Sequence, residues 1–177
     1  MILRPIERAD LPLTVAWRND PHARPGLRTP FPLNQDQQDA FYREVICNRA
    51  SLHRYWILEQ DGQSVGMGGL TNIQWENRIA EISLITDPSV RGKGYGAEGV
   101  RLLLREAFLS FGLLTVCGEV YCVNPATTFW DKMIERYAGE STTLPRRKWW
   151  DGTLHDAMYF TFTAERAIPI VTEDEAA

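Results

Sequence analysis

Six consecutive residues near the middle of the chain have the types and spacing of an anion-binding turn: Arg91, Gly92, Lys93, Gly94, Tyr95 and Gly96. They follow an apolar, β-branched stretch and precede apolar residues at helical spacing, which predicts strand, turn and helix. Glycines let the backbone approach a ligand closely. The first amides of a helix are unpaired and lie at the positive end of its dipole. Such a turn favours a pyrophosphate, although a glycine-rich loop without a ligand has a similar pattern.

Two other phosphate-binding motifs fit the sequence less well. The loop of nucleotide hydrolases needs Gly-Lys followed by Ser or Thr, whereas here Gly94 is followed by Tyr95. The dinucleotide fingerprint G-x-G-x-x-G is formally met by Gly94, Gly96 and Gly99. That fingerprint belongs to a parallel βαβ unit with an acidic residue about 20 residues further on. The segments that flank this turn are instead typical of antiparallel hairpins.

Length and composition predict one soluble globular domain. The chain has 177 residues, of which 44% are hydrophobic and 24% charged, as is ordinary for such a domain. The net charge of −4 gives no basic field for nucleic acid, so we expect no nucleic-acid partner. No apolar run approaches the roughly 20 residues of a membrane span, and the N-terminus lacks the apolar core of a signal peptide.

The three cysteines, Cys47, Cys117 and Cys122, have no metal-ligand spacing. Cys117 and Cys122 lie in one apolar segment, which favours buried free thiols over a disulfide. We therefore expect no metal site and a cytoplasmic, reducing environment.

Hydrophobic periodicity and turn residues predict an α/β domain over residues 1–165 with a flexible acidic tail over 166–177. A proline-rich loop is expected at 21–33, and Asp10 is expected to cap the first helix. Helices are predicted at 11–18, at 34–49, from the glycine-rich turn to Phe111, and at 127–136. Strands are predicted at 2–6, 52–60, 65–75, 80–86, 115–123, 144–150 and 154–163.

The motif R-x-x-G-x-G at Arg91, Gly94 and Gly96 resembles the coenzyme A pyrophosphate loop of the GNAT superfamily of N-acetyltransferases. The order of the predicted elements agrees with that family over most of the chain. The opening ILRPIERADL, the WRND segment and the late WWDGTLHDAMYF are similar to the branch of ribosomal-protein alanine, spermidine/spermine and aminosugar N-acetyltransferases. The resemblance implies a single domain with a mixed, mostly antiparallel twisted sheet and a V-shaped opening for coenzyme A.

The resemblance also implies acetyl-CoA as the acyl donor and a set of residues that hold it. Asn124 matches an asparagine that binds the pantetheine arm in the family, and backbone around Ile85, Thr86 and Val90 would contact the same arm. The residues implied at the pyrophosphate are Arg91, Gly92, Lys93, Gly94, Tyr95, Gly96 and Ala97.

Acetyl transfer in this family proceeds by direct attack of a neutral amine, so the resemblance implies a general base and no nucleophilic cysteine. Two glutamates are candidates. Glu81 lies on the strand that leads into the glycine-rich turn, and Glu119 lies on the strand after the long helix. The alternative for each is a strand residue that faces solvent or an arginine.

The expected general acid is missing from its usual place. Family members have a tyrosine about seven residues after the asparagine, whereas here that count reaches Asp131, and one deletion places Trp130 there. An indole N–H donates a hydrogen bond but does not release a proton at working pH. Tyr121 or Tyr137 is expected to substitute, unless the thiolate is protonated by water or the protein no longer catalyses the transfer.

By family analogy, a small-molecule amine such as a polyamine or an aminosugar is preferred to a protein N-terminus as the acceptor. A non-catalytic acyl-CoA-binding module is the alternative, and a homodimer is possible as in relatives. In the proline-rich loop, His22, Arg24 and Arg28 are either acceptor contacts or solvated residues. The basic run 146–148 is either a contact for an anionic acceptor or, more simply, a solvated strand edge.

Overall fold

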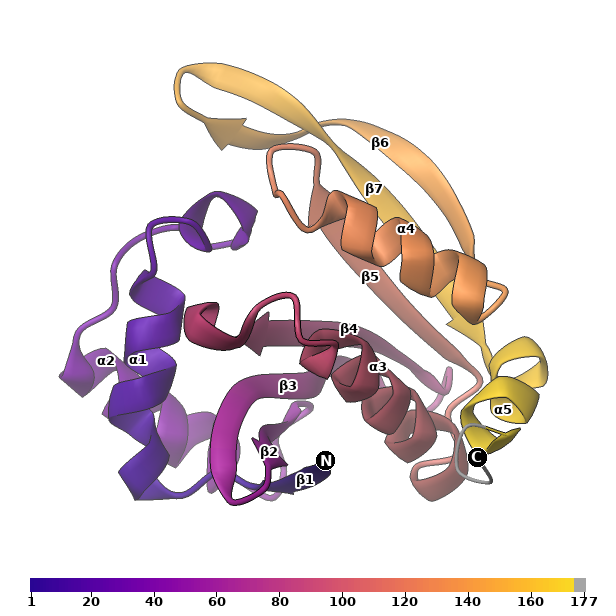
Figure 1. Cartoon of the computed structure of the whole chain (residues 1–177), viewed down its shortest axis with the longest axis horizontal. Coiled ribbons are helices and arrows are strands. Elements are labelled where there is room, and N and C mark those ends of the chain that lie inside the picture. The colour runs from indigo at the N-terminus through magenta and orange to yellow at the C-terminus, as the bar shows by residue number, and fades with distance from the viewer. Residues whose placement is uncertain (174–177) are drawn as a thin grey trace.

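The structure is a computed structural model in which residues 1–173 are described, and its centre is one twisted seven-stranded sheet (Figure 1). The strand order is β1-β2-β3-β4-β5-β7-β6, and β4 with β5 is its parallel pair. The predicted mixed, mostly antiparallel α/β fold is therefore confirmed. The strands are β1 Ile2–Pro5, β2 Arg54–Gln60, β3 Gln63–Gln74, β4 Ile79–Thr86, β5 Thr115–Tyr121, β6 Glu140–Trp150 and β7 Thr153–Thr163.

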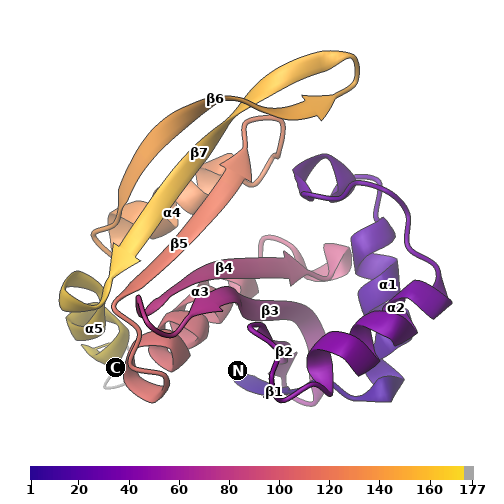
Figure 2. The same cartoon turned by 180° about the vertical axis from the view of Figure 1, so that it is seen from behind.

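Five α-helices cover the two faces of this sheet (Figures 1 and 2). They are α1 Leu11–Asn19, α2 Gln35–Phe41, α3 Tyr95–Arg105, α4 Thr127–Arg136 and α5 Ala164–Glu173. Helices α3, α4 and α5 enclose the larger hydrophobic core, whereas α1 packs over β2 and β3 around a smaller one. Single π-helical turns at Tyr42–Ile46 and Glu106–Ser110 extend α2 and α3 toward the predicted ends of these helices.

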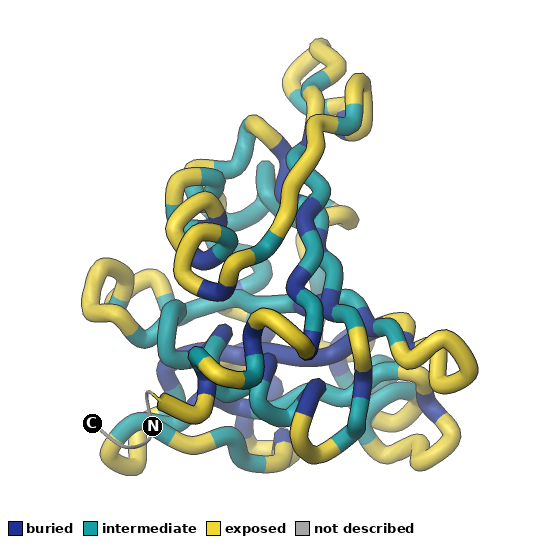
Figure 3. The backbone as a smooth tube through the Cα atoms, turned by 90° about the vertical axis from the view of Figure 1, so that its right-hand side faces the viewer, coloured by how far each residue is buried: buried dark blue, intermediate teal, exposed yellow. Residues whose placement is uncertain are grey.

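Apolar burial follows the expected strand alternation and helix periodicity. Figure 3 shows buried segments along the strands and exposed segments at the turns and on the outer sides of helices. On β5, the even-numbered Val116 and Val120 point into the larger core. The odd-numbered residues of β5 therefore point to the opposite face of the sheet.

The sheet opens between β4 and β5. The parallel register pairs Ile79, Ala80 and Glu81 with Thr115, Val116 and Cys117, and it stops there. On its other edge, β4 stays paired with β3 as far as Thr86. Within residues 1–173, the stretch of β4 after Glu81 consequently has no strand partner on the β5 side. Figures 1 and 2 show the two strands diverging as the arms of a V.

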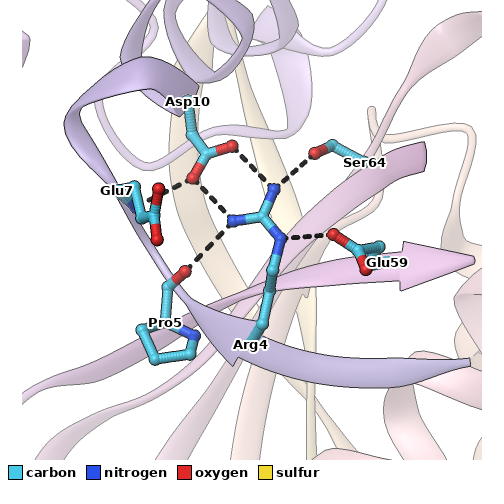
Figure 4. Close-up of polar contacts among 6 residues, drawn as sticks. All are labelled: Arg4, Pro5, Glu7, Asp10, Glu59 and Ser64. Carbon is cyan, nitrogen blue, oxygen red and sulfur yellow. Dashed lines mark hydrogen bonds and ion pairs between the residues drawn. The ribbon is translucent and has the colours of Figure 1, made fainter. Parts of the chain in front are cut away.

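An ion network fixes β1 to the start of α1 (Figure 4). The Arg4 guanidinium donates to both carboxylate oxygens of Asp10 at 2.8 Å, and it also binds Glu59 and the Ser64 hydroxyl. We expected the Asp10 side chain to cap the helix that follows. That expectation was wrong, because this carboxylate accepts from the Glu7 amide and from Arg4 and makes no cap bond to α1.

The C-terminal segment differs from the prediction of a flexible tail over 166–177. Residues Ala164–Glu173 form α5, in which Ala164, Ala167 and Val171 are buried against α3 and the larger core. Small and apolar residues at helical spacing allow this close packing. Residues 174–177 lie outside the described part of the chain.

The cysteines are free, as expected, but they are less buried than expected. Cys47 and Cys122 are exposed, and Cys117 is half-buried, because β5 ends one residue before Cys122. Among the described residues no helix has the length and apolar character needed to cross a membrane. In the same part of the chain, no three His, Cys, Asp or Glu side chains gather where they could hold a metal ion.

Candidate active site

The glycine-rich turn has the geometry of an anion cradle. Gly92 and Gly94 adopt φ values of 80° and 85°, in the left-handed region that favours glycine, and Gly94 is the N-cap of α3. A Cβ added to either glycine would meet no atom within 4 Å, so the space in front of the turn is open. Lys93 is exposed beside them. The unpaired first amides of α3 and this open, positive surface fit a pyrophosphate.

Arg91 lies at the same turn but is engaged elsewhere. Its Nη2 donates to Oδ2 of Asp20 at 2.7 Å, and Asp20 is the residue that follows α1. This ion pair ties the glycine-rich turn to the start of the proline-rich loop. An anion bound at the turn would compete with Asp20 for Arg91.

The other residues expected around coenzyme A line the path from the turn to the V. Val90 ends a 3₁₀ turn over Pro88–Val90, and its carbonyl accepts from the Lys93 amide at 3.4 Å. Ile85 and Thr86 end β4, Tyr95 opens α3, and Ala97 packs against the larger core. A Cβ on Gly96 would lie 3.4 Å from the Phe129 ring, so α4 approaches the N-terminus of α3 through Phe129. The sequence analysis did not single out this phenylalanine.

Asn124 stands where β5 gives way to α4. Its Oδ1 accepts from the Ala126 amide at 2.9 Å, which starts the turn into the helix. Its amide nitrogen faces Gly26 of the proline-rich loop, where an added Cβ would come within 2.2 Å of Nδ2. The amide expected to hold the pantetheine arm is thus closed over by that loop.

Neither residue of α4 at the usual position of the tyrosine, Trp130 or Asp131, is a tyrosine, and the substitute Tyr137 is buried in the core. Trp130 is 9% exposed and stacks on Phe160 with the ring centroids 4.7 Å apart, so it packs in the core between α4 and the sheet. Asp131 is exposed. Tyr137 is fully buried at the end of α4 and packs edge-on against Phe162. This leaves Tyr121 as the expected substitute whose position fits.

Glu81 is the last β4 residue that pairs with β5, so its side chain stands at the vertex of the V. Its carboxylate accepts from the Arg28 guanidinium and, at 2.9 Å, from the Asn72 side-chain amide. Asn72 lies at an irregularity of the β3–β4 register with φ of 50°. Asn is among the few residues that tolerate this left-handed conformation, and a lone Asn near a strand end was not a sufficient signal to predict the contact.

Cys117, Glu119 and Tyr121 share the face of β5 opposite α4. Glu119 accepts from the Nε of Arg147 at 2.9 Å. Tyr121 is 7% exposed, and the ammonium of Lys148 lies 5.0 Å from its ring centroid. On neighbouring β7, a hydrogen bond with Cys117 together with burial raises the pKa of Tyr159 to about 12. Tyr159 therefore keeps its proton, and it is a further hydroxyl on this face that the sequence analysis missed.

Residues 20–30, which we call the strap, lie at the open side of the V (Figures 1 and 2). The Leu27 carbonyl accepts from the Nζ of Lys148 at 2.6 Å, and Arg28 reaches Glu81 on β4 and Tyr121 on β5. The hydrogen bonds of Arg28 with Glu81 and with Tyr121 raise the pKa of Arg28, and the bond with Glu81 is the larger cause. The strap therefore spans both arms of the V.

Of the three basic residues of this loop that could be either acceptor contacts or solvated residues, the structure brings Arg28 to the site. Arg24 turns back and donates to the Pro30 carbonyl at 2.8 Å, and the exposed His22 contacts Asp20 through its backbone amide. In the basic run 146–148, the expectation of a solvated edge was wrong for Lys148, which is 5% exposed. A register shift of β6 between Leu144 and Lys148 accompanies this inward position.

Comparison with known proteins agrees with this geometry. A family model described as the acetyltransferase (GNAT) domain matches residues 1–128. No curated protein sequence matches the chain at a significant level.

Solved structures with the same fold include a spermidine N-acetyltransferase from Vibrio cholerae in complex with CoA and spermine. Its TM-score is 0.84 at 19% identity, over 94% of this chain and 97% of that one. A spermidine/spermine N-acetyltransferase from the same organism, in complex with manganese ions, gives a TM-score of 0.78 at 20% identity over 95% of both chains. The expected fold, the N-acetyltransferase class and acetyl-CoA as donor are thereby confirmed.

Proposed function

Because the chain belongs to the GNAT acetyltransferase family, we propose that it transfers the acetyl group of acetyl-CoA to the primary amine of a small molecule. One observation carries this proposal. The β4–β5 ladder ends at Glu81, so a carboxylate stands at the vertex of an opening whose far end meets the glycine-rich turn. A thioester inserted between the strands would meet an amine beside that carboxylate.

The donor side is formed by backbone and by two basic side chains. When bound, coenzyme A supplies the acetyl thioester. The first amides of α3, with Arg91 and Lys93, hold its pyrophosphate, and Arg91 exchanges Asp20 for the phosphate oxygens. The unpaired edge of β4 around Ile85 and Thr86 binds the pantetheine amides, and Asn124 contributes its side-chain amide once Gly26 moves away.

On the acceptor side, Glu81 takes the proton from the ammonium of the acceptor, directly or through a water molecule. Arg28 occupies this carboxylate in the structure, so acceptor binding displaces the guanidinium. Glu119 is the second candidate for the base. It lies on β5 two residues after Cys117, the partner of Glu81 in the ladder, and its carboxylate is held by Arg147. The reaction needs no covalent enzyme intermediate, and the cysteines have no catalytic role in it.

Tyr121 donates the proton to the departing thiolate. It takes the place of the tyrosine that relatives carry on the helix after β5. Its support is its position on β5 next to Arg28 and Lys148, two cations that favour negative charge nearby.

A second candidate function is a coenzyme A-binding module without turnover. It is motivated by α4, whose residues 127–136 contain no tyrosine and whose Trp130 packs in the core. A protein N-terminus is the alternative acceptor. The spermidine acetyltransferases among the structural neighbours favour a small molecule.

The test is release of free thiol from acetyl-CoA with a panel of polyamines, amino sugars and peptides that begin with Ala or Ser. Acceptor-dependent release is the expected result. Coenzyme A binding, measured by calorimetry, without release for any amine would instead support the binding module.

A further inference from the structure

The groups around Glu81 carry more positive than negative charge. Four cations contact the strap or the glutamates of this face: Lys148 and Arg18 bind strap residues, Arg28 of the strap binds Glu81, and Arg147 binds Glu119. The site is therefore positive by about two charges at neutral pH. This is opposite to the net charge of −4 of the whole chain.

The cations are linked through the strap and two tyrosines. Arg28 contacts Tyr121, the ammonium of Lys148 lies over the same ring, and Arg147 is within electrostatic reach of both Tyr121 and Arg28. Arg18 donates to the Thr29 hydroxyl of the strap at 3.3 Å. Tyr55, beside Arg18, is within electrostatic reach of Arg28 and Glu81.

Two of these cations have no anion. In the described part of the chain no carboxylate forms an ion pair with Lys148 or Arg18, whereas Arg28 and Arg147 each have a glutamate. Lys148 is 5% exposed and donates a hydrogen bond to the Leu27 carbonyl, and the Nε of Arg18 is buried without an acceptor. Burial lowers the pKa of both groups, which reflects the cost of holding these charges away from water.

A buried cation without a counter-ion is unfavourable, and an anion that reaches it offsets much of the desolvation cost. A polyamine would bring further positive charge to a site whose two glutamates are already paired. A carboxylate or a phosphate would instead meet two unneutralised cations beside the proposed base.

Resting on the proposed function, we propose that the acceptor is a primary amine that carries its own anionic group. The anion binds Lys148 and Arg18 under the strap, and the amine of the same molecule displaces Arg28 from Glu81. Lys148 and Arg18 are therefore specificity-determining residues rather than groups that move protons.

The test compares matched amines that differ in charge. Putrescine is paired with γ-aminobutyrate, which exchanges an ammonium for a carboxylate, and glucosamine is paired with glucosamine phosphate. We expect kcat/KM to be at least about tenfold higher for the anionic member of one pair. A higher kcat/KM for γ-aminobutyrate than for putrescine would identify the anion as a carboxylate, and a higher kcat/KM for glucosamine phosphate than for glucosamine would identify it as a phosphate.

Variants test the residues themselves. Lys148→Met should raise KM for the preferred anionic amine about tenfold or more and leave KM for its non-anionic partner and for acetyl-CoA unchanged. Lys148→Arg, which keeps the charge, should restore most of the loss. Arg18→Met is a second variant if Lys148→Met folds poorly. Arg166→Gln is the matched control, because this exposed arginine pairs with Glu140, near the opposite end of β6 from Lys148.

Higher kcat/KM for putrescine and glucosamine than for their anionic partners would overturn this inference and leave the acetyltransferase proposal standing. An equal rise of KM for both members of a pair in Lys148→Met would overturn it as well. Absence of turnover with every amine would overturn both proposals.

Discussion

Replacing Glu81 by glutamine removes the carboxylate at the vertex of the V and keeps the shape of the side chain. Arg28 and Asn72 donate to different oxygens of the carboxylate, and glutamine has a single amide oxygen, so the variant keeps one of these two hydrogen bonds and loses the other. It also loses the negative charge and the ability to take a proton. If Glu81 is the base, turnover at neutral pH falls while the fold persists.

The size of the effect follows from the acceptor and from the exposure of the ion pair. A primary amine has a pKa near that of lysine, so only about one molecule in a thousand is neutral at pH 7.4. Loss of a general base typically costs about 10²- to 10⁴-fold in rate. The Arg28 side chain is 59% exposed and that of Glu81 21%, and such pairs contribute about 0–1 kcal/mol of stability. For a domain of this size the melting temperature should change by less than about 4 °C.

Thiol release is measured for both proteins from pH 7 to pH 9.5 with the preferred amine. In the variant, the rate should rise about tenfold per pH unit, because solvent then removes the proton from the amine. The gap to the wild type should narrow as the pH rises. Glu140→Gln is the matched control, since Glu140 also pairs with an arginine, on the edge strand β6, which is separated from β4 by β5 and β7. The reasoning is refuted if Glu81→Gln keeps wild-type activity at pH 7, or if its deficit is the same at pH 9.5; Glu119→Gln would then be the next variant.

Three further outcomes are expected. Gly94→Ala forces alanine into a left-handed conformation, which costs about 1–2 kcal/mol, so the Kd for acetyl-CoA should rise about tenfold. The control is Gly62→Ala in the β2–β3 hairpin, where the backbone is also left-handed. This control should lower the melting temperature without changing the Kd for acetyl-CoA. Hydrogen bonds from Arg4 hold the pKa of Asp10 below its ordinary value, so its contribution is present at neutral pH and disappears as the pH falls through that lowered pKa. The melting-temperature gap between wild type and Asp10→Asn should thus be largest near pH 7 and close in acid. Tyr121→Phe keeps the ring beneath Lys148 and should lower kcat about tenfold or more with an unchanged Kd for acetyl-CoA; unchanged kcat would exclude Tyr121 as the proton donor.

The local features of the site were predictable because they depend on short stretches of sequence. The glycine-rich turn, the strand before it and the helix after it follow from residue type and spacing alone. The same holds for Glu81 at the edge of the opening, since its place follows from the order of the strands. These parts of the fold were correctly predicted, whereas the roles given to the site residues stay predictions.

Long-range contacts were not predictable in this way. The run of Arg146, Arg147 and Lys148 is typical of a solvated edge, and only the register shift in β6 and the strap above it bury Lys148. The ion pair of Arg28 with Glu81 joins residues 53 positions apart. The C-terminal helix was missed because the polar residues and the acidic end suggested disorder, whereas Ala167 and Val171 find a partner surface on α3 that lies far away in the sequence.

The short β4–β5 ladder also has a mechanical consequence. Three residue pairs join the sheet half formed by β1–β4 to the half formed by β5, β7 and β6, whereas each neighbouring antiparallel pair within a half has more. Relative rotation of the two halves therefore concentrates at this ladder, with α3 and α5 packed alongside it as a brace. The strap joins the two halves across the V, through Glu81 at the vertex on one side and Lys148 on the other. The ladder is the pivot about which the two halves can rotate, and the strap holds the halves together across the opening. The distance between the halves therefore depends on whether the strap keeps its bonds to Glu81 and Lys148 or gives them up to a bound ligand.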